Sequence, residues 1–172
     1  VGGGVAGDVD PTNPGTEMWY DRSGLLNMKG ERVGDNPSST QFLIWWDGDL
    51  SRELLNGNRV DKYRVGRIFT AEGAMSAAGS KNTPVLSADL FGDWREEIIY
   101  RTPDNQSLRI YTTTIPTKHR LYTLMHDPQY RLSIAWQNVA YNQPPHTSFF
   151  LGTGMKKAPK PGIIMIKGRA GR

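Results

Sequence analysis

Three stretches of the chain gather carboxylates within a few residues of one another, directly before a short apolar run. Each stretch ends in a glutamate, and these three glutamates follow one another at spacings of 36 and 44 residues. Carboxylate oxygens are hard donors of the kind that calcium takes, and a loop with acids at alternate positions can point several of them at one ion. The predicted calcium ligands are Asp8, Asp10, Glu17, Asp47, Asp49, Glu53, Asp89, Asp93 and Glu97.

A second interpretation of the same acids needs no ion. Acidic side chains in loops commonly accept hydrogen bonds from backbone N–H groups and so cap turns. None of the three stretches is an EF-hand, because the first lacks the third acid and the glycine at the required positions and helices do not flank it. Recurrence at the same place in each unit favours calcium, and we expect such ions to tie loops together rather than to take part in chemistry.

The elements around the acids repeat as well. After each acidic stretch come an apolar pair, a turn and a second apolar run, with the turns at residues 21–24, 56–58 and 103–105. An Asn-Gly pair between two apolar runs, as at Asn56-Gly57, is among the strongest local signals for a hairpin. The repeating unit is therefore an acidic loop, a strand, a turn and a strand. Further strands are expected at residues 42–46, 65–69 and 85–88.

Two hairpins in a unit of roughly 40 residues match a four-stranded propeller blade. The sequence therefore predicts an all-β fold, a β-propeller-type repeat of about four blades, in residues 1–155, and a basic C-terminal tail in residues 156–172. A generic all-β sandwich is the alternative, and three matching copies favour the propeller. From about residue 112 onward the repeat fades, and residues 130–138 fit either a short helix or a strand.

Composition limits the partners. The chain has no cysteine, which excludes a disulfide framework and thiolate metal sites. It has no apolar run of about 18 residues, so no membrane span is expected, and its start at Val1 followed by three glycines carries no information on localisation. A net charge of +4 without a recognisable nucleic-acid-binding motif suits an anionic polysaccharide better than a nucleic acid. Part of this charge lies in the tail, at Lys156, Lys157, Lys160, Lys167, Arg169 and Arg172.

Residues 71–83 form a stretch of small residues that interrupts the repeat and accounts for the longer second spacing. Loops on a rigid scaffold often carry function. Composition alone, however, fits a plain flexible connector, and a single lysine such as Lys81 in a Gly-Ser loop is usually just solvated.

Long, ordered blocks of the sequence resemble the C-terminal part of bacterial rhamnogalacturonan lyases of the eight-bladed β-propeller type. The resemblance covers most of residues 5–152 and implies bound calcium, secretion, and cleavage of the rhamnose–galacturonate backbone of pectin by β-elimination. It implies that the present chain supplies about half of the ring, since eight units of roughly 40 residues are needed. The blocks that carry it are residues 44–49, 84–97, 126–131 and 135–145.

This reaction needs a base for the C5 proton of galacturonate, positive charge for the enolate-like intermediate, and an acid for the O4 leaving group. The resemblance implies that Lys81 handles substrate charge or the proton, and that Tyr141 is an acid/base or hydrogen-bond donor. A lysine can act as base only if its pKa is lowered. Ala78 departs from the family, which tends to carry a polar asparagine there. The predicted substrate-binding residues are Gly79, Ser80, Asn138 and Val139.

Three assemblies fit a chain of this length. It can close as a four-bladed ring, associate as a homodimer that completes a larger ring, or form an arc of a larger molecule. Self-association is favoured, because unpaired blade faces are costly to leave in water. Two functions compete with lyase activity: a non-catalytic, calcium-stabilised carbohydrate-binding or scaffold fragment, and a glycan-degrading enzyme of altered specificity.

Overall fold

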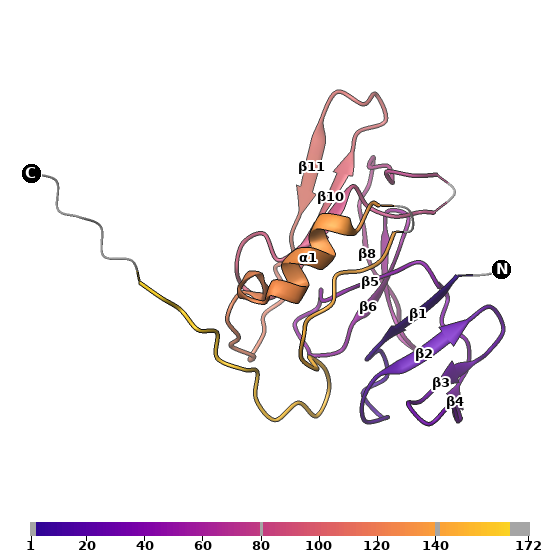
Figure 1. Cartoon of the computed structure of the whole chain (residues 1–172). Coiled ribbons are helices and arrows are strands. Elements are labelled where there is room, and N and C mark those ends of the chain that lie inside the picture. The colour runs from indigo at the N-terminus through magenta and orange to yellow at the C-terminus, as the bar shows by residue number, and fades with distance from the viewer. Residues whose placement is uncertain (1–2, 80, 140–141, 166–172) are drawn as a thin grey trace, which may run out of the picture.

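The computed structural model describes residues 3–79, 81–139 and 142–165, and these form three antiparallel sheets followed by a short helical region (Figure 1). Sheet 1 holds β1 (Gly4–Gly7), β2 (Glu17–Tyr20), β3 (Leu25–Leu26) and β4 (Arg32–Gly34). Sheet 2 holds β5 (Phe42–Ile44), β6 (Glu53–Asn56), β7 (Arg59–Lys62) and β8 (Gly66–Thr70). Sheet 3 holds β9 (Leu86–Ala88), β10 (Glu97–Arg101) and β11 (Leu108–Tyr111), and the helical region holds the 3₁₀ turn η1 (Leu124–His126) and α1 (Pro128–Trp136).

The predicted all-β class is confirmed, and each predicted hairpin unit corresponds to one sheet. The strands expected at residues 42–46, 65–69 and 85–88 are β5, β8 and β9. The ambiguous stretch is helical, because Asp127 caps α1 by accepting a hydrogen bond from the backbone of Gln129 at 2.9 Å. In the described part of residues 112–165 no strand follows β11, so three sheets are observed and closure into a ring is not.

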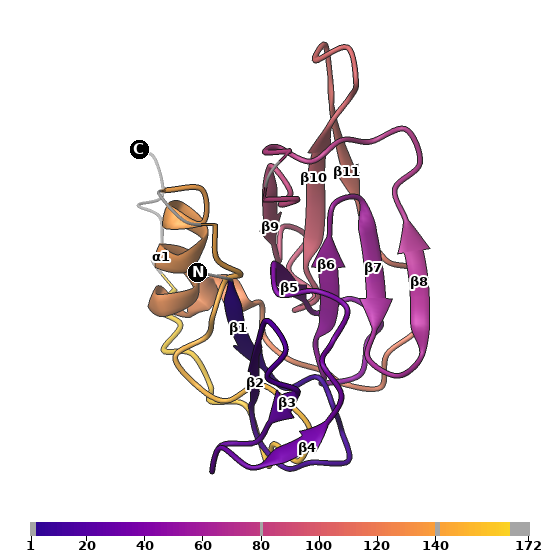
Figure 2. The ribbon, with the colours of Figure 1, turned by 90° about the vertical axis from the view of Figure 1, so that its right-hand side faces the viewer.

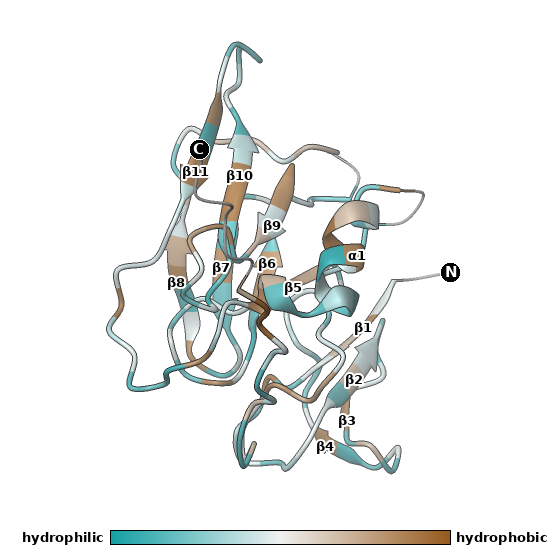
Figure 3. Cartoon of the chain, turned by 60° about the vertical axis from the view of Figure 1, so that its left-hand side comes forward, coloured by the Kyte–Doolittle hydropathy of each residue, from teal (hydrophilic) through white to brown (hydrophobic). Residues whose placement is uncertain are grey.

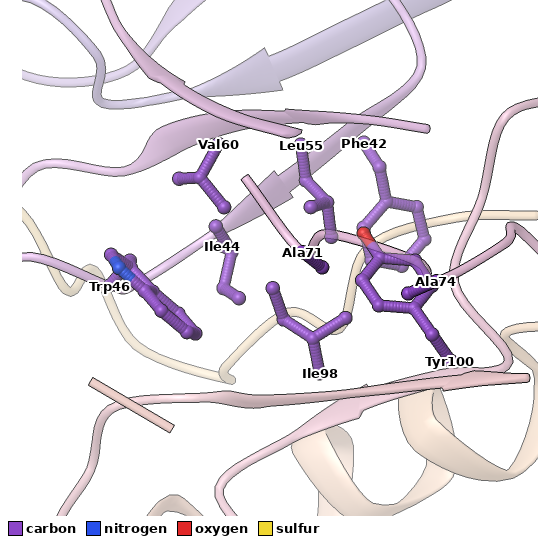
Figure 4. Packing of buried hydrophobic residues seen from close by; sticks show 9 residues of the cluster. All are labelled: Phe42, Ile44, Trp46, Leu55, Val60, Ala71, Ala74, Ile98 and Tyr100. Atoms are coloured by element: carbon purple, nitrogen blue, oxygen red, sulfur yellow. The ribbon is translucent and has the colours of Figure 1, made fainter. Parts of the chain in front are cut away.

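Sheet 2 lies in the middle, and its strands β5 and β6 are buried on both faces, which explains the unbroken apolar run at residues 42–46. Alternate residues of a strand point to opposite faces. Phe42 and Ile44 therefore pack toward Ile98 of sheet 3, as Figure 4 shows. Leu43 packs toward Trp19 of sheet 1. A third apolar cluster attaches the helical region, and its buried members are Trp45, Trp94, Leu124, Tyr130 and Leu151.

The strand directions separate two ends of the sheets (Figure 2). β6 and β10 each begin at the end of an acidic stretch, so the acidic stretches share one end, which we call the acid-loop end. The β6–β7 turn and the loop at residues 71–83 lie at the opposite end, which we call the Lys81 end. There the backbone N–H of Gly57 donates to the carbonyl of Asn82 at 2.7 Å. No helix in the described residues is long and apolar enough to cross a membrane.

Candidate functional site

The glutamate that closes each acidic stretch caps its own loop. Oε2 of Glu17 accepts hydrogen bonds from the backbone N–H groups of Val9 at 2.9 Å and Asp10 at 3.2 Å. The turn-capping interpretation is therefore correct for the glutamates, whatever else they bind. The same geometry recurs in Glu53, with Trp46 and Asp47 at 2.8 and 3.3 Å, and in Glu97, with Leu90 and Phe91 at 2.8 and 3.0 Å.

The residues before two of the capping glutamates, Glu53 and Glu97, link their sheets to the preceding ones. The backbone N–H of Arg52 donates to the carbonyl of Asp8 at 2.6 Å, and that of Glu96 donates to the carbonyl of Trp45 at 2.9 Å. Asp8, Trp45 and Asp89 therefore hold the same place in their units. The aspartates of the three stretches do not all hold equivalent places, since a tryptophan occupies this one in the second unit.

One group of three carboxylates could hold a metal ion among the residues that the structure describes. The ligand oxygens of Asp47, Asp49 and Glu53 lie within 4.8 Å of one another. The ammonium of Lys62 contacts all three, at 2.5 Å from Asp49 Oδ2 and 3.2 Å from Glu53 Oε1, with a hydrogen bond to Asp47 as well. A cation thus already stands among these acids, and it is supplied by β7 of the same sheet.

The charges of this cluster respond to burial and to one another. Burial raises the pKa of Glu53 to about 8, with Asp47 acting in the same direction. Burial alone would lower the pKa of Lys62, but Glu53 and the two aspartates outweigh it and raise that pKa above its ordinary value. Burial likewise opposes ionisation of Asp49, yet hydrogen bonds from Lys62 and Ser51 lower its pKa.

The first and third stretches place their acids differently, and their predicted metal binding stays a prediction. Asp10 accepts hydrogen bonds from Thr12 at 2.7 and 3.0 Å and lies 3.3 Å from an Arg64 nitrogen. Asp93 pairs with its neighbour Arg95 at 2.5 Å. Asp8 and Asp89 are both buried, and Oδ1 of each has no hydrogen-bond partner in the described part of the chain. Both oxygens can therefore still accept a hydrogen bond or bind a cation.

Behind the acidic stretches lies a buried polar network that the sequence did not indicate. The guanidinium of Arg52 lies 3.5 Å from the carboxylate of Glu96 and 4.0 Å from the ring centre of Trp45. Tyr130 of α1 donates its hydroxyl hydrogen to Glu96 Oε1 at 2.7 Å and accepts from the backbone N–H of Asp89 at 2.9 Å. Burial raises the pKa of Glu96, and Arg52 opposes that shift. The network joins sheet 2, sheet 3 and the helix.

At the Lys81 end the predicted lysine lies on a tight turn. The turn is closed by a β-bridge between Ala78 and Thr83, and the backbone N–H groups of Lys81 and Asn82 both donate to the carbonyl of Ala78, at 3.2 and 2.9 Å. Asn82 has a positive φ of 51°, a conformation that asparagine tolerates better than most residues. Lys81 is half-buried, and Gly79 is exposed.

The structure brings the segment after α1 to Val85, just beyond this turn. The side-chain amide of Asn138 donates to the carbonyl of Val85 at 2.5 Å, four residues after Lys81. Asn138 and Val139 are both exposed there. Two segments that lie more than 50 residues apart in sequence thus meet at this end of the sheets, where the Asn138 carboxamide donates to Val85 and accepts a hydrogen bond from the side chain of Asn142. Ser80 and Tyr141 lie outside the described residues, so their roles stay predictions.

Comparison with known proteins shows which family the chain belongs to. The Rhamnogalacturonan lyase family 11, C-terminal domain, matches residues 1–161. The chain is 62% identical to the rhamnogalacturonan endolyase YesW of Bacillus subtilis (strain 168) over 95% of its length, and 51% identical to the exolyase YesX of the same strain over 99%. It spans only 27% and 31% of these two relatives.

Solved structures of rhamnogalacturonan lyases are similar to the chain in fold as well. The crystal structure of YesW superposes on 95% of the chain with a TM-score of 0.89 at 58% identity, and a Bacillus licheniformis rhamnogalacturonan lyase superposes on 94% with a TM-score of 0.89 at 54% identity. The chain covers 29% of each of these structures. The chain belongs to rhamnogalacturonan lyase family 11 and corresponds to its C-terminal domain.

Proposed function

We propose that this member of the family acts in the cleavage of the rhamnogalacturonan backbone of pectin, by β-elimination at galacturonate. The observation that carries the proposal is the hydrogen bond from Asn138 to Val85, which brings an exposed residue of the segment after α1 to a point four residues from the half-buried Lys81. The relatives named as an endolyase and an exolyase point to the same substrate. Secretion, which a plant cell-wall substrate requires, is part of this proposal.

The proposed chemistry breaks the C4–O4 bond and forms a C4–C5 double bond. In one form of the step Lys81, as a neutral amine, accepts the C5 proton, and Tyr141 gives its hydroxyl proton to the departing O4. In the other form the Lys81 ammonium pairs with the galacturonate carboxylate and stabilises the charge that develops, while Tyr141, as a phenolate, takes the C5 proton and passes it to O4. Gly79, Ser80, Asn138 and Val139 position the sugar.

We also propose calcium as a structural ion at the acid-loop end. The three carboxylates of Asp47, Asp49 and Glu53 supply a hard oxygen donor set, and the open oxygens of Asp8 and Asp89 mark two further places for a cation. Bound calcium would supply positive charge that holds the acidic stretches to their strands. At the first of these places it would compete with the ammonium of Lys62.

We propose in addition that the sheets form part of an eight-bladed propeller, with self-association as the route for the isolated chain. Leu86, Ile99 and Ile110 are cross-strand neighbours on the face of sheet 3 that points away from sheet 2, and parts of β9, β10 and β11 are accordingly brown in Figure 3. Ile110 is 53% exposed. A further sheet would bury this face. Size-exclusion chromatography with light scattering tests the homodimer, and a clean monomer contradicts it.

The lyase proposal is tested by adding rhamnogalacturonan to the 172-residue chain with calcium present and following ultraviolet absorbance of the unsaturated product. We expect a rise that is lost in Lys81→Ala and Tyr141→Phe. A flat trace with rhamnogalacturonan contradicts lyase activity of the chain by itself. A rise with another pectic, cellulosic or hemicellulosic substrate instead identifies an enzyme of altered specificity.

The second candidate is a non-catalytic, calcium-stabilised carbohydrate-binding or scaffold domain. It is favoured by the small share of the relatives that the chain spans, 27% and 31%. Calorimetric titration with rhamnogalacturonan oligosaccharides distinguishes the two functions. Binding without any absorbance change supports the second candidate, and turnover excludes it.

A further inference from the structure

Gln137, the residue that follows α1, makes an unusual pair of hydrogen bonds to one residue of sheet 3. Its Oε1 accepts from the backbone N–H of Ser87 at 2.8 Å, and its Nε2 donates to the backbone carbonyl of Ser87 at 2.9 Å. Gln137 is 1% exposed and Ser87 is fully buried. A single carboxamide therefore satisfies both polar backbone groups of a residue that water does not reach.

This pair replaces a neighbouring strand. Within the described chain β9 pairs with β10 on one side only, and no strand pairs with its other edge. Buried backbone N–H and carbonyl groups at a strand edge need partners, because each one left unpaired is costly. The carboxamide of Gln137 has the same donor and acceptor as a peptide group, and it stands where the peptide of the next strand would stand.

The two residues joined in this way are close in sequence to the two parts of the proposed active surface. Ser87 lies six residues after Lys81, and Gln137 directly precedes Asn138. The bond from Asn138 to the carbonyl of Val85 extends the attachment by one residue after Gln137 and by two residues before Ser87. We propose that Gln137 is a positioning residue for the lyase reaction, which fixes the distance between the Lys81 turn and the segment that begins at Asn138.

The proposal rests on the lyase function, and its physical reason is geometric. Reacting groups must be held to within a fraction of an ångström, and a misplacement of about 1 Å can cost roughly 100-fold in rate. Gln137 is not needed merely to attach the helix. Tyr130, two turns earlier, already anchors α1 through Glu96 and Asp89. The two anchors therefore separate attachment of the helix from placement of its end.

The experiment compares Gln137→Met, Gln137→Glu and the control Tyr130→Phe in the full 172-residue chain. Gln137→Met keeps the volume and loses both hydrogen bonds, and we expect kcat to fall about 10-fold or more with KM nearly unchanged. Tyr130→Phe loses two buried hydrogen bonds of the same helix, and we expect it to lower the urea midpoint while leaving kcat within about twofold.

Gln137→Glu supplies a readout that a purely structural role would not move. Only the protonated carboxyl group has both the donor and the acceptor that Ser87 needs. We therefore expect the kcat of this variant, relative to the parent chain, to recover as the pH falls, whereas the ratio for Gln137→Met stays flat. Equal losses of kcat in all three variants, or no pH dependence in Gln137→Glu, overturn the proposal.

If the parent chain shows no turnover, that result counts against the lyase function but not against the positioning role of Gln137. Amide hydrogen exchange then tests the positioning role. In Gln137→Met we expect faster exchange at the Ser87 amide and in residues 81–86 and 137–139, with protection of residues 97–101 kept. Unchanged exchange at Ser87 contradicts the positioning role. Loss of protection throughout sheet 3 contradicts it as well, because it would show a role in folding.

Discussion

The two ends of the sheets are built in opposite ways. At the acid-loop end the capping glutamates and Arg52 are buried, and the charges are neutralised within the protein by Arg52, Lys62 and hydrogen bonds from the backbone. At the Lys81 end Lys81 is half-buried and Asn138 and Val139 are exposed, and the bonds that hold their segments are mainly to backbone groups. Dense internal pairing stabilises the fold, while chemistry on a polymer needs groups that are fixed in place and still open to the ligand.

Lys81→Ala is the substitution that should separate the two ends most strongly. We expect the rate of product formation to fall by roughly 10²–10⁴-fold, the usual contribution of a positioned acid or base, with the urea midpoint unchanged. Lys118→Ala is the matched control, since Lys118 is exposed and adjoins Thr117, whose hydroxyl donates to the carbonyl of Gly48 at the acid-loop end. Equal activity of the two variants would remove the distinction between the ends.

Arg52→Met should show the reverse pattern, a loss of stability without a specific loss of catalysis. It leaves the buried carboxylate of Glu96 without its cation, and breaking such a pair costs about 3–5 kcal/mol. Urea unfolding with an unchanged m-value measures this. The exposed pair of Arg67 and Asp61 provides the control, and Arg67→Met should cost at most about 1 kcal/mol. Similar losses of unfolding free energy in Arg52→Met and Arg67→Met would show that the buried network contributes no more to stability than a surface ion pair.

The capping role of the glutamates predicts a smaller, chemically specific effect. Glu17→Ala leaves the N–H groups of Val9 and Asp10 without their acceptor, which should cost about 2 kcal/mol or more. Glu17→Gln retains a carbonyl oxygen at that position and should recover most of the stability in the absence of calcium. A Glu17→Gln variant as unstable as Glu17→Ala would show that the negative charge, rather than the acceptor, matters.

The smallest expected effect is on pH dependence. Burial raises the pKa of Glu17 from about 4.5 to about 7, and burial also raises the pKa values of Asp8 and Glu97. The folded chain therefore binds these protons more tightly than the unfolded chain. For Glu17, the contribution of proton binding to the free energy of unfolding is fully present below about pH 4.5 and declines as the pH rises toward 7. With EDTA present we expect Tm to fall by a few degrees, on the order of 5 °C, between pH 5 and pH 8.

If calcium binds at the acid-loop end, Tm should rise rather than fall between pH 5 and pH 8, because a bound cation favours the ionised carboxylates. Differential scanning calorimetry at both pH values, with EDTA or with calcium, measures the four midpoints. A Tm that rises with pH in EDTA would contradict the buried, proton-binding state of Glu17. Identical slopes with and without calcium would argue against a metal at this end.

The sequence predicts what depends on neighbouring residues. The hairpin at Asn56-Gly57 and the capped loop before Glu17 follow from local turn chemistry, and the structure contains the hairpin and confirms the cap. The sequence does not predict contacts between residues that are far apart along the chain. Gln137 and Ser87 are 50 residues apart, and Tyr130 and Glu96 are 34 apart. The one signal for Glu96 was its place beside Glu97, since alternation forces the two side chains to opposite faces.

Lys62 was missed for a related reason. It follows Glu53 by nine residues and reaches the acids only because β6 and β7 form a hairpin that returns it to the same end of the sheet. Three acids at short spacing are a local pattern, whereas their neutralising cation depends on register. The sequence leaves residues 130–138 undecided because the short pattern fits either a helix or a strand, and the cap at Asp127 shows that a helix begins there.

The hydrogen bonds from Arg52 to Asp8 and from Glu96 to Trp45 give the array a direction. Each unit has a backbone N–H that can donate to the unit before it and a backbone carbonyl that can accept from the unit after it, so the same type of hydrogen bond joins successive units. The matching positions at the two ends are the N–H of Thr16 and the carbonyl of Asp89. Because these two hydrogen bonds join backbone groups, aspartate and tryptophan can both occupy the acceptor position, although at the second joint the Glu96 carboxylate also accepts from the backbone N–H of Trp45. Whole units could therefore be duplicated or deleted in evolution, and their side chains could diverge, while the backbone hydrogen bonds between units are kept.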